Sequence, residues 1–123
     1  PFQHESYGDN LARCQRYYYL HVSGNSKEVN NGFWYGTGEF DMPIMFGVSM
    51  RDAPSLDEVT GTSYYRLQGG NAGNTNFDSF TLQFGSATGC NLYNGSLSGG
   101  TLGDGANAVT YNSSSFLAFD AEL

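Results

Sequence analysis

Residues 115–123 read SFLAFDAEL, and this stretch decides the fold class. Its apolar residues recur at every second position, at Leu117, Phe119, Ala121 and Leu123. Side chains two positions apart lie on the same face of a β-strand, whereas a helix brings positions three and four apart together. The stretch therefore predicts a strand that packs one face in a core up to Leu123.

The same two-residue period recurs elsewhere in the chain. In FDSFTLQF, Phe80, Leu82 and Phe84 alternate with Thr81 and Gln83, which predicts a half-buried strand. Similar strands are predicted around residues 46–50, 63–68 and 87–93. No 11-residue window keeps an apolar period of 3.6, and the 17 glycines favour turns. About eight short strands predict an all-β fold, an antiparallel β-sandwich or jelly roll, with an up-and-down barrel as the main alternative.

One short helix is predicted before the first strand. Asp9 is a suitable N-cap, and Leu11, Ala12 and Cys14 follow it. We therefore divide the chain into a joint segment with this short N-terminal helix, residues 1–15, and a β-sandwich module, residues 16–123.

Composition disfavours several classes of partner and cofactor. The formal net charge is -7 and the five basic residues are scattered, so nucleic acid is not an expected partner. The apolar runs are far shorter than the roughly 20 residues of a membrane-spanning helix, so no membrane insertion is predicted. Cys14 and Cys90 lack metal-ligand spacing and are predicted to be free, buried thiols, with one disulfide between them as the alternative. We predict no metal site and no cofactor.

Three consecutive tyrosines occur in residues 10–22, NLARCQRYYYLHV. Alternation predicts that Tyr18, Leu20 and Val22 share the core face of a strand. The opposite face would then carry Tyr17, Tyr19 and His21. Because that face is too aromatic to be left in water, we predict that it contacts a second surface, either a partner subunit or module, or a ligand.

Other aromatic residues lie on predicted strands or beside loops that are rich in Asn and Asp. A flat ring can cover the apolar face of a sugar while amides and carboxylates bind its hydroxyl groups. The predicted ligand-binding residues are Trp34, Tyr35, Tyr64 and Tyr93.

No catalytic residue is predicted. Glu39 and Asp41 flank Phe40, and Asp52, Asp57 and Glu58 surround a turn, but such spacings are common among the surface carboxylates of acidic proteins. The histidines and Cys14 come with no recognisable nucleophile motif. The chain is therefore predicted not to be an enzyme.

Three motifs resemble phage tail-fibre and related virion structural proteins. The first, PFQHESYGDNLARCQRYYY at residues 1–19, is similar to the family form PFEHRSYGEELARCQRYY, with Gln3 and Glu5 in place of Glu and Arg. The second, MRDAPSL at residues 50–56, is similar to MRAAPT, and the terminal AFDAEL is similar to ADAEL or FSAEL. The resemblance implies a distal module of a virion appendage, built as a β-sandwich. It also implies that the module assembles as a homotrimer and that other virion proteins are its partners.

The leading hypothesis is thus a non-enzymatic virion module, located in the extracellular particle, that attaches a tail fibre to a host surface glycan. Three weak sites on one rigid tip would bind firmly through avidity. One alternative is a capsid decoration or head-fibre protein without a receptor. A polysaccharide depolymerase, which would need a carboxylate pair in a groove, is a further alternative.

Overall fold

The computed structural model describes residues 6–69 and 73–122. These residues form one helix and ten strands. They are α1 (Tyr7–Gln15), β1 (Tyr18–Ser23), β2 (Glu28–Trp34), β3 (Phe40–Met45), β4 (Ser55–Val59), β5 (Tyr65–Gln68), β6 (Asn74–Phe77), β7 (Thr81–Gln83), β8 (Gly89–Asn94), β9 (Gly105–Thr110) and β10 (Phe116–Asp120).

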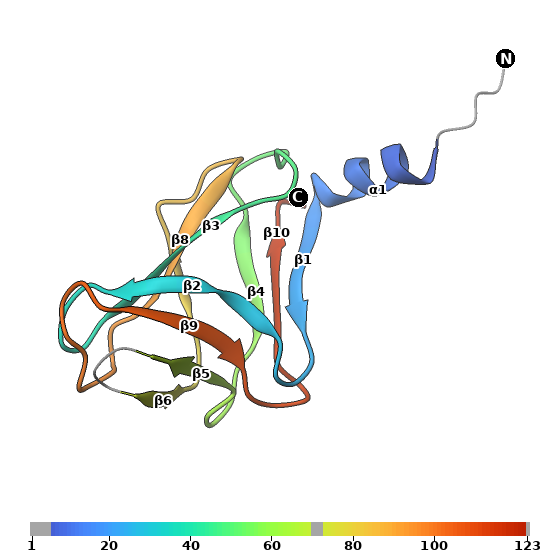
Figure 1. Ribbon diagram of the computed structural model, residues 1–123. Coiled ribbons are helices and arrows are strands. Elements are labelled where there is room, and N and C mark those ends of the chain that lie inside the picture. Colours follow the sequence, from blue (N-terminus) through green and yellow to red (C-terminus); the bar gives the residue numbers. More distant parts are fainter. Residues whose placement is uncertain (1–5, 70–72, 123) are drawn as a thin grey trace, which may run out of the picture.

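The strands form two antiparallel sheets, and this confirms the predicted fold class, an all-β sandwich with one N-terminal helix. The smaller sheet has the order β1-β10-β4, and the larger has the order β6-β5-β9-β2-β3-β8-β7. Figure 1 shows the larger sheet curling into a half-barrel, with the smaller sheet beside it. Most neighbours within a sheet are distant in sequence, so the order of the strands depends on tertiary pairing.

The core lies between the two sheets and is built around β10. Leu117, Phe119 and Ala121 are buried, as the alternation predicted, and Leu123 lies outside the described residues. The Phe119 ring contacts Phe46 at a centroid distance of 4.8 Å. From the larger sheet, Tyr65 and its neighbours on the same face complete the apolar interior. Burial of this strand therefore holds the sheets together.

The predicted faces of β1 are wrong at four of its residues. Tyr19 stacks on Phe119 at a centroid distance of 6.4 Å, and His21 meets the same ring edge-on at 6.1 Å. Leu20 is half exposed, and the Tyr18 hydroxyl donates a hydrogen bond to Asp57 on the outer side of the small sheet.

A β-bulge explains this reversal. The pairing of β1 with β10 shifts register between Leu20 and Val22. The extra residue lets His21 and Val22 both turn toward the core, whereas strict alternation would separate them. Val22 is buried as predicted. Tyr19 and His21 are consequently core residues, and only Tyr17 of the predicted interface residues stays at the surface.

The strand predicted at FDSFTLQF is shorter than its alternation suggests. β7 covers only Thr81–Gln83. Phe80 is buried just before it, but Phe84 has a φ of 55° and is exposed. A residue in the left-handed region cannot continue a strand, so β7 ends before the apolar alternation in the sequence does.

Helix α1 begins earlier than predicted. Ser6, not Asp9, is the N-cap, and its hydroxyl accepts a hydrogen bond from the Asp9 amide at 3.1 Å. No residue of α1 is buried, and Figure 1 shows the helix projecting away from both sheets. Cys14 is therefore exposed, contrary to the prediction, while Cys90 is buried and free as predicted.

Candidate functional site

Trp34, one of the four predicted ligand-binding residues, does not place its ring at the surface. Trp34 is fully buried and packs edge-on against Phe40 at a centroid distance of 5.9 Å. Gly100 covers the indole so closely that a Cβ atom added to this glycine would overlap the ring. Trp34 is thus a core residue, and the prediction that it binds a ligand as a surface ring is wrong.

The neighbours of Trp34 on β2 face the other way and begin a distinct surface. Phe33 is 40 % exposed, and Tyr35, just past the end of β2, is 62 % exposed. In the sheet, Phe33 lies opposite Asp41 on β3, which lies opposite Tyr93 on β8. We call the solvent side of the seven-stranded sheet the outer face. It brings the predicted Tyr35 and Tyr93 together with Phe33, which the sequence did not single out.

Two carboxyl groups lie among these rings. The Glu39 backbone carbonyl accepts a hydrogen bond from the Tyr35 amide at 2.9 Å, which pairs the two residues across the connection between β2 and β3. A hydrogen bond to Asp41 raises the pKa of Glu39, and burial and the charge of Asp41 act in the same direction.

Asp41 is almost completely buried on this face. Its Oδ2 accepts a hydrogen bond from Asn91 Nδ2 at 3.3 Å. Its Oδ1 finds no donor in the described part of the chain. Asp41 therefore presents a buried carboxyl group, with one oxygen bonded to Asn91, on the outer face.

Tyr64, the fourth predicted ligand-binding residue, does not join this group. Its ring packs against the core and over Gly61, where an added Cβ would meet the ring at 2.5 Å. Its carbonyl accepts hydrogen bonds from Ser115 Oγ and the Tyr111 amide, both at 2.7 Å. In the sheet, β9 and β2 separate β5, which follows Tyr64, from β3. Tyr64 therefore has a packing role.

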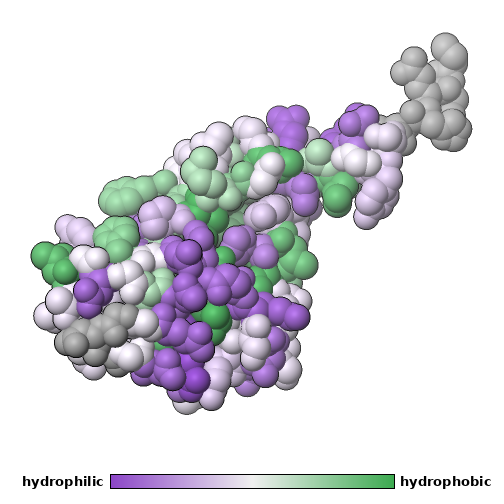
Figure 2. Space-filling model, viewed as in Figure 1, coloured by the Kyte–Doolittle hydropathy of each residue, from purple (hydrophilic) through white to green (hydrophobic). Residues whose placement is uncertain are grey.

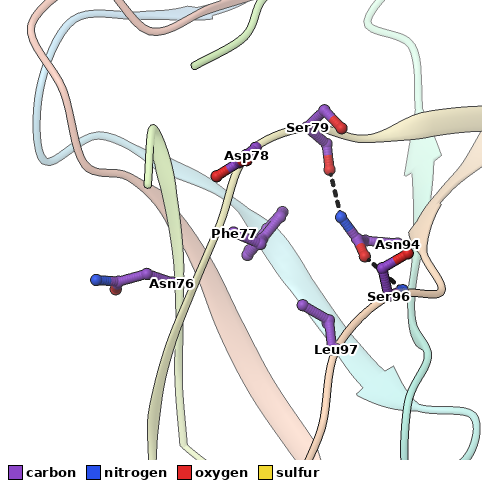
Figure 3. A pocket seen from close by; sticks show the side chains of 7 residues that line it. All are labelled: Asn76, Phe77, Asp78, Ser79, Asn94, Ser96 and Leu97. Atoms are coloured by element: carbon purple, nitrogen blue, oxygen red, sulfur yellow. Dashed lines mark hydrogen bonds between the residues drawn. The ribbon is translucent and has the colours of Figure 1, made fainter. Parts of the chain in front are cut away.

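A separate pocket of about 400 Å³ lies between the chain around β6 and β7 and the end of β8. Figure 3 shows Asn94 reaching across it, where Asn94 Nδ2 donates to the Ser79 carbonyl at 2.9 Å. Asn94 Oδ1 accepts from the Ser96 amide at 2.8 Å, and Asp78 Oδ1 accepts from the Ser63 amide at 2.8 Å. Because these polar groups bond within the protein, the pocket is less suited to a ligand than the outer face.

Of the predicted interface residues, Tyr17 is the one that stays accessible. Its ring is 41 % exposed, and the Arg51 guanidinium lies 5.9 Å from its centroid. Its carbonyl accepts a hydrogen bond from the Ala121 amide at 2.8 Å, which fixes the backbone but leaves the ring at the surface.

No protein-family model, curated protein or solved structure matches the chain. Within the described residues, no group of three or more His, Cys, Asp and Glu side chains could hold a metal ion. No helix in this part of the chain is both long and apolar enough to cross a lipid bilayer. The function is therefore inferred from the outer face and the sequence motifs.

Proposed function

We propose that the chain is a non-enzymatic module of a phage tail fibre or related virion appendage that attaches to a host surface glycan through the outer face. The observation that carries the proposal is the grouping of Tyr35, Phe33 and Tyr93 around the Glu39 and Asp41 carboxyl groups. The three motifs that resemble virion proteins support the virion assignment.

The chemistry of the outer face suits sugars. Exposed rings offer flat apolar surface to the C–H face of a pyranose. Carboxyl and amide groups beside them can accept from and donate to hydroxyl groups. Phe33, Asp41 and Tyr93 lie on strands whose backbones are fixed by pairing, which limits the conformational entropy lost on binding.

The carboxyl pair is poorly arranged for glycoside hydrolysis. The two carboxyl groups of a retaining glycosidase lie about 5–5.5 Å apart, and those of an inverting enzyme lie farther apart. Asp41 is instead almost completely buried and bonded to Asn91, so it does not line an open groove in which a glycosidic bond could lie between two carboxyl groups. This geometry favours binding over depolymerisation.

A glycan array with the purified chain tests the proposal. We expect binding to a subset of surface polysaccharides, and we expect Tyr35→Ala to weaken it roughly 2- to 10-fold, because the variant removes a stacking ring. Tyr7→Ala is the matched control, since Tyr7 is an exposed ring on α1 away from the outer face. An array that stays silent with the wild-type chain would contradict the proposal and favour a structural role without a receptor.

A further inference from the structure

Four carboxamide side chains form a continuous row on the outer face. Asn31 on β2 lies opposite Asn107 on β9. Asn107 lies opposite Gln68 on β5, and Gln68 lies opposite Asn74 on β6. We call these four residues the amide ladder. Figure 2 shows hydrophilic residues gathered where Figure 1 places β2, β9 and β5.

The orientation of the ladder is fixed by burial on the opposite side of the sheet. Leu67 and Ala108, the strand neighbours of Gln68 and Asn107, are fully buried. All four ladder residues are exposed. Side chains that alternate with buried neighbours must point to solvent, so the row cannot turn inward without breaking the core.

The amides of the ladder are free to bind. Other amides of this sheet are engaged within the protein, as Asn30 Nδ2 donates to the Pro43 carbonyl and Asn76 Oδ1 accepts from Arg66 Nε. The ladder side chains make no hydrogen bond to the described residues. Each carboxamide can both donate and accept, which is the pattern that a sugar hydroxyl requires.

A hollow of about 370 Å³ lies along the ladder, lined by Asn31, Gly32, Gln68, Gly105, Ala106 and Asn107. Gly105 lies opposite Phe33, so one side of this exposed ring has no neighbouring side chain on β9. Glycine at such a strand position permits the close approach of a ligand. From β6 to β2 the ladder crosses three strand intervals, roughly 14 Å, which is longer than one pyranose ring.

The charges around the ladder disfavour an anionic ligand. The four amides are neutral, Glu28 and Asp41 lie on β2 and β3, and Glu39 directly precedes β3. The cation on β5, Arg66, is already engaged, because its guanidinium lies 3.7 Å from the Tyr111 ring centroid and its Nε donates a hydrogen bond to Asn76. Lys27, which precedes Glu28, adds one further cation, so the three carboxylates still outnumber the unengaged basic groups and disfavour acidic sugars.

We infer that the amide ladder is the binding path of an uncharged oligosaccharide chain, which crosses β6, β5, β9 and β2 and stacks a sugar on Phe33. This inference rests on the proposed function and names its ligand class. A chain that follows the ladder contacts several amides at once, so affinity increases with chain length until the ladder is filled.

Titration of the full chain with neutral and acidic oligosaccharides tests the inference. The probes are cellohexaose, maltohexaose, mannohexaose and hexagalacturonate, with the shorter members of each series. We expect one neutral series to bind with length-dependent affinity and to shift the side-chain amide NMR signals of the ladder. Asn107→Asp should weaken that binding roughly 2- to 10-fold, because it keeps the shape but removes a donor and adds a charge.

Gln68→Glu is a second, independent variant of the ladder, and Asn25→Asp is the control, since Asn25 is exposed in the turn between β1 and β2. Thermal unfolding midpoints verify that each variant is folded. Binding that survives both ladder variants, or preferred binding of hexagalacturonate, overturns the inference but leaves the glycan-binding proposal intact. If no saccharide binds the wild-type chain, both are overturned.

Discussion

Glu58 is an acidic residue in a partly buried position. It lies on β4 opposite Leu117 and points between the sheets. Its carboxylate oxygens accept hydrogen bonds from the Phe80 amide at 3.2 and 3.3 Å. Burial nevertheless outweighs this donor and raises the pKa of Glu58 from 4.5 to about 7.

Stability should therefore decrease as pH rises through the pKa of Glu58. Between about pH 4.5 and 7 the folded state keeps the proton on Glu58, whereas the unfolded state releases it. The stabilisation that protonated Glu58 gives to the folded state is therefore complete below pH 4.5 and lost above about pH 7. After allowance for solvent screening of a partly exposed group, we expect a loss of about 1 to 2 kcal/mol.

Glu58→Gln tests this by thermal and urea unfolding across that range. The variant should keep an acceptor for the Phe80 amide and show a flatter pH dependence than the wild-type chain. Glu28→Gln, an exposed glutamate on β2, should keep the wild-type slope. Identical slopes for Glu58→Gln and the wild type would refute the assignment.

At the scale of elements, β1 shows how a single bulge redirects a strand. Tyr19 contacts Phe46, Phe119 and His21, so it belongs to the core cluster. Tyr17, two positions earlier, precedes β1 and keeps its ring at the surface.

Substitution of these two tyrosines by serine should separate their roles. Tyr19→Ser should lower the free energy of unfolding by about 2 to 4 kcal/mol, since it removes a packed ring. Tyr17→Ser should lower it by less than about 1 kcal/mol. Urea unfolding measures both values, and comparable losses at the two positions would contradict the bulge-defined faces.

At the scale of the whole molecule, the proposed attachment depends on assembly. The projecting helix α1 and the exposed ring of Tyr17 lie at the same end of the chain, on the sequence that resembles the virion joint. A trimer would present three outer faces together and raise the apparent affinity for a polymeric glycan.

Light scattering after size exclusion, over a dilution series, measures the assembly state. We expect a trimer for the wild-type chain and dissociation at higher concentration for Tyr17→Ser, whose thermal unfolding should otherwise match the wild type. Leu102→Ser, an exposed apolar side chain outside the joint, serves as the control. A wild-type monomer at every concentration would contradict assembly through this segment alone.

The sequence by itself determined the all-β class, the N-terminal helix and the buried face of β10. These properties follow from local periodicity, because a two-residue alternation with a buried core leaves one choice of face. It also pointed to Tyr35 and Tyr93 as candidate ligand-binding rings, although it could not distinguish these two rings from that of the buried Trp34.

Only the tertiary structure decided the faces of β1 and the composition of the outer face. A bulge and a register are set by backbone hydrogen bonds to a partner strand, and no local pattern encodes that partner. Asn31, Asn107 and Gln68 come from strands far apart in the chain, and they form the amide ladder because β9 pairs with both β2 and β5.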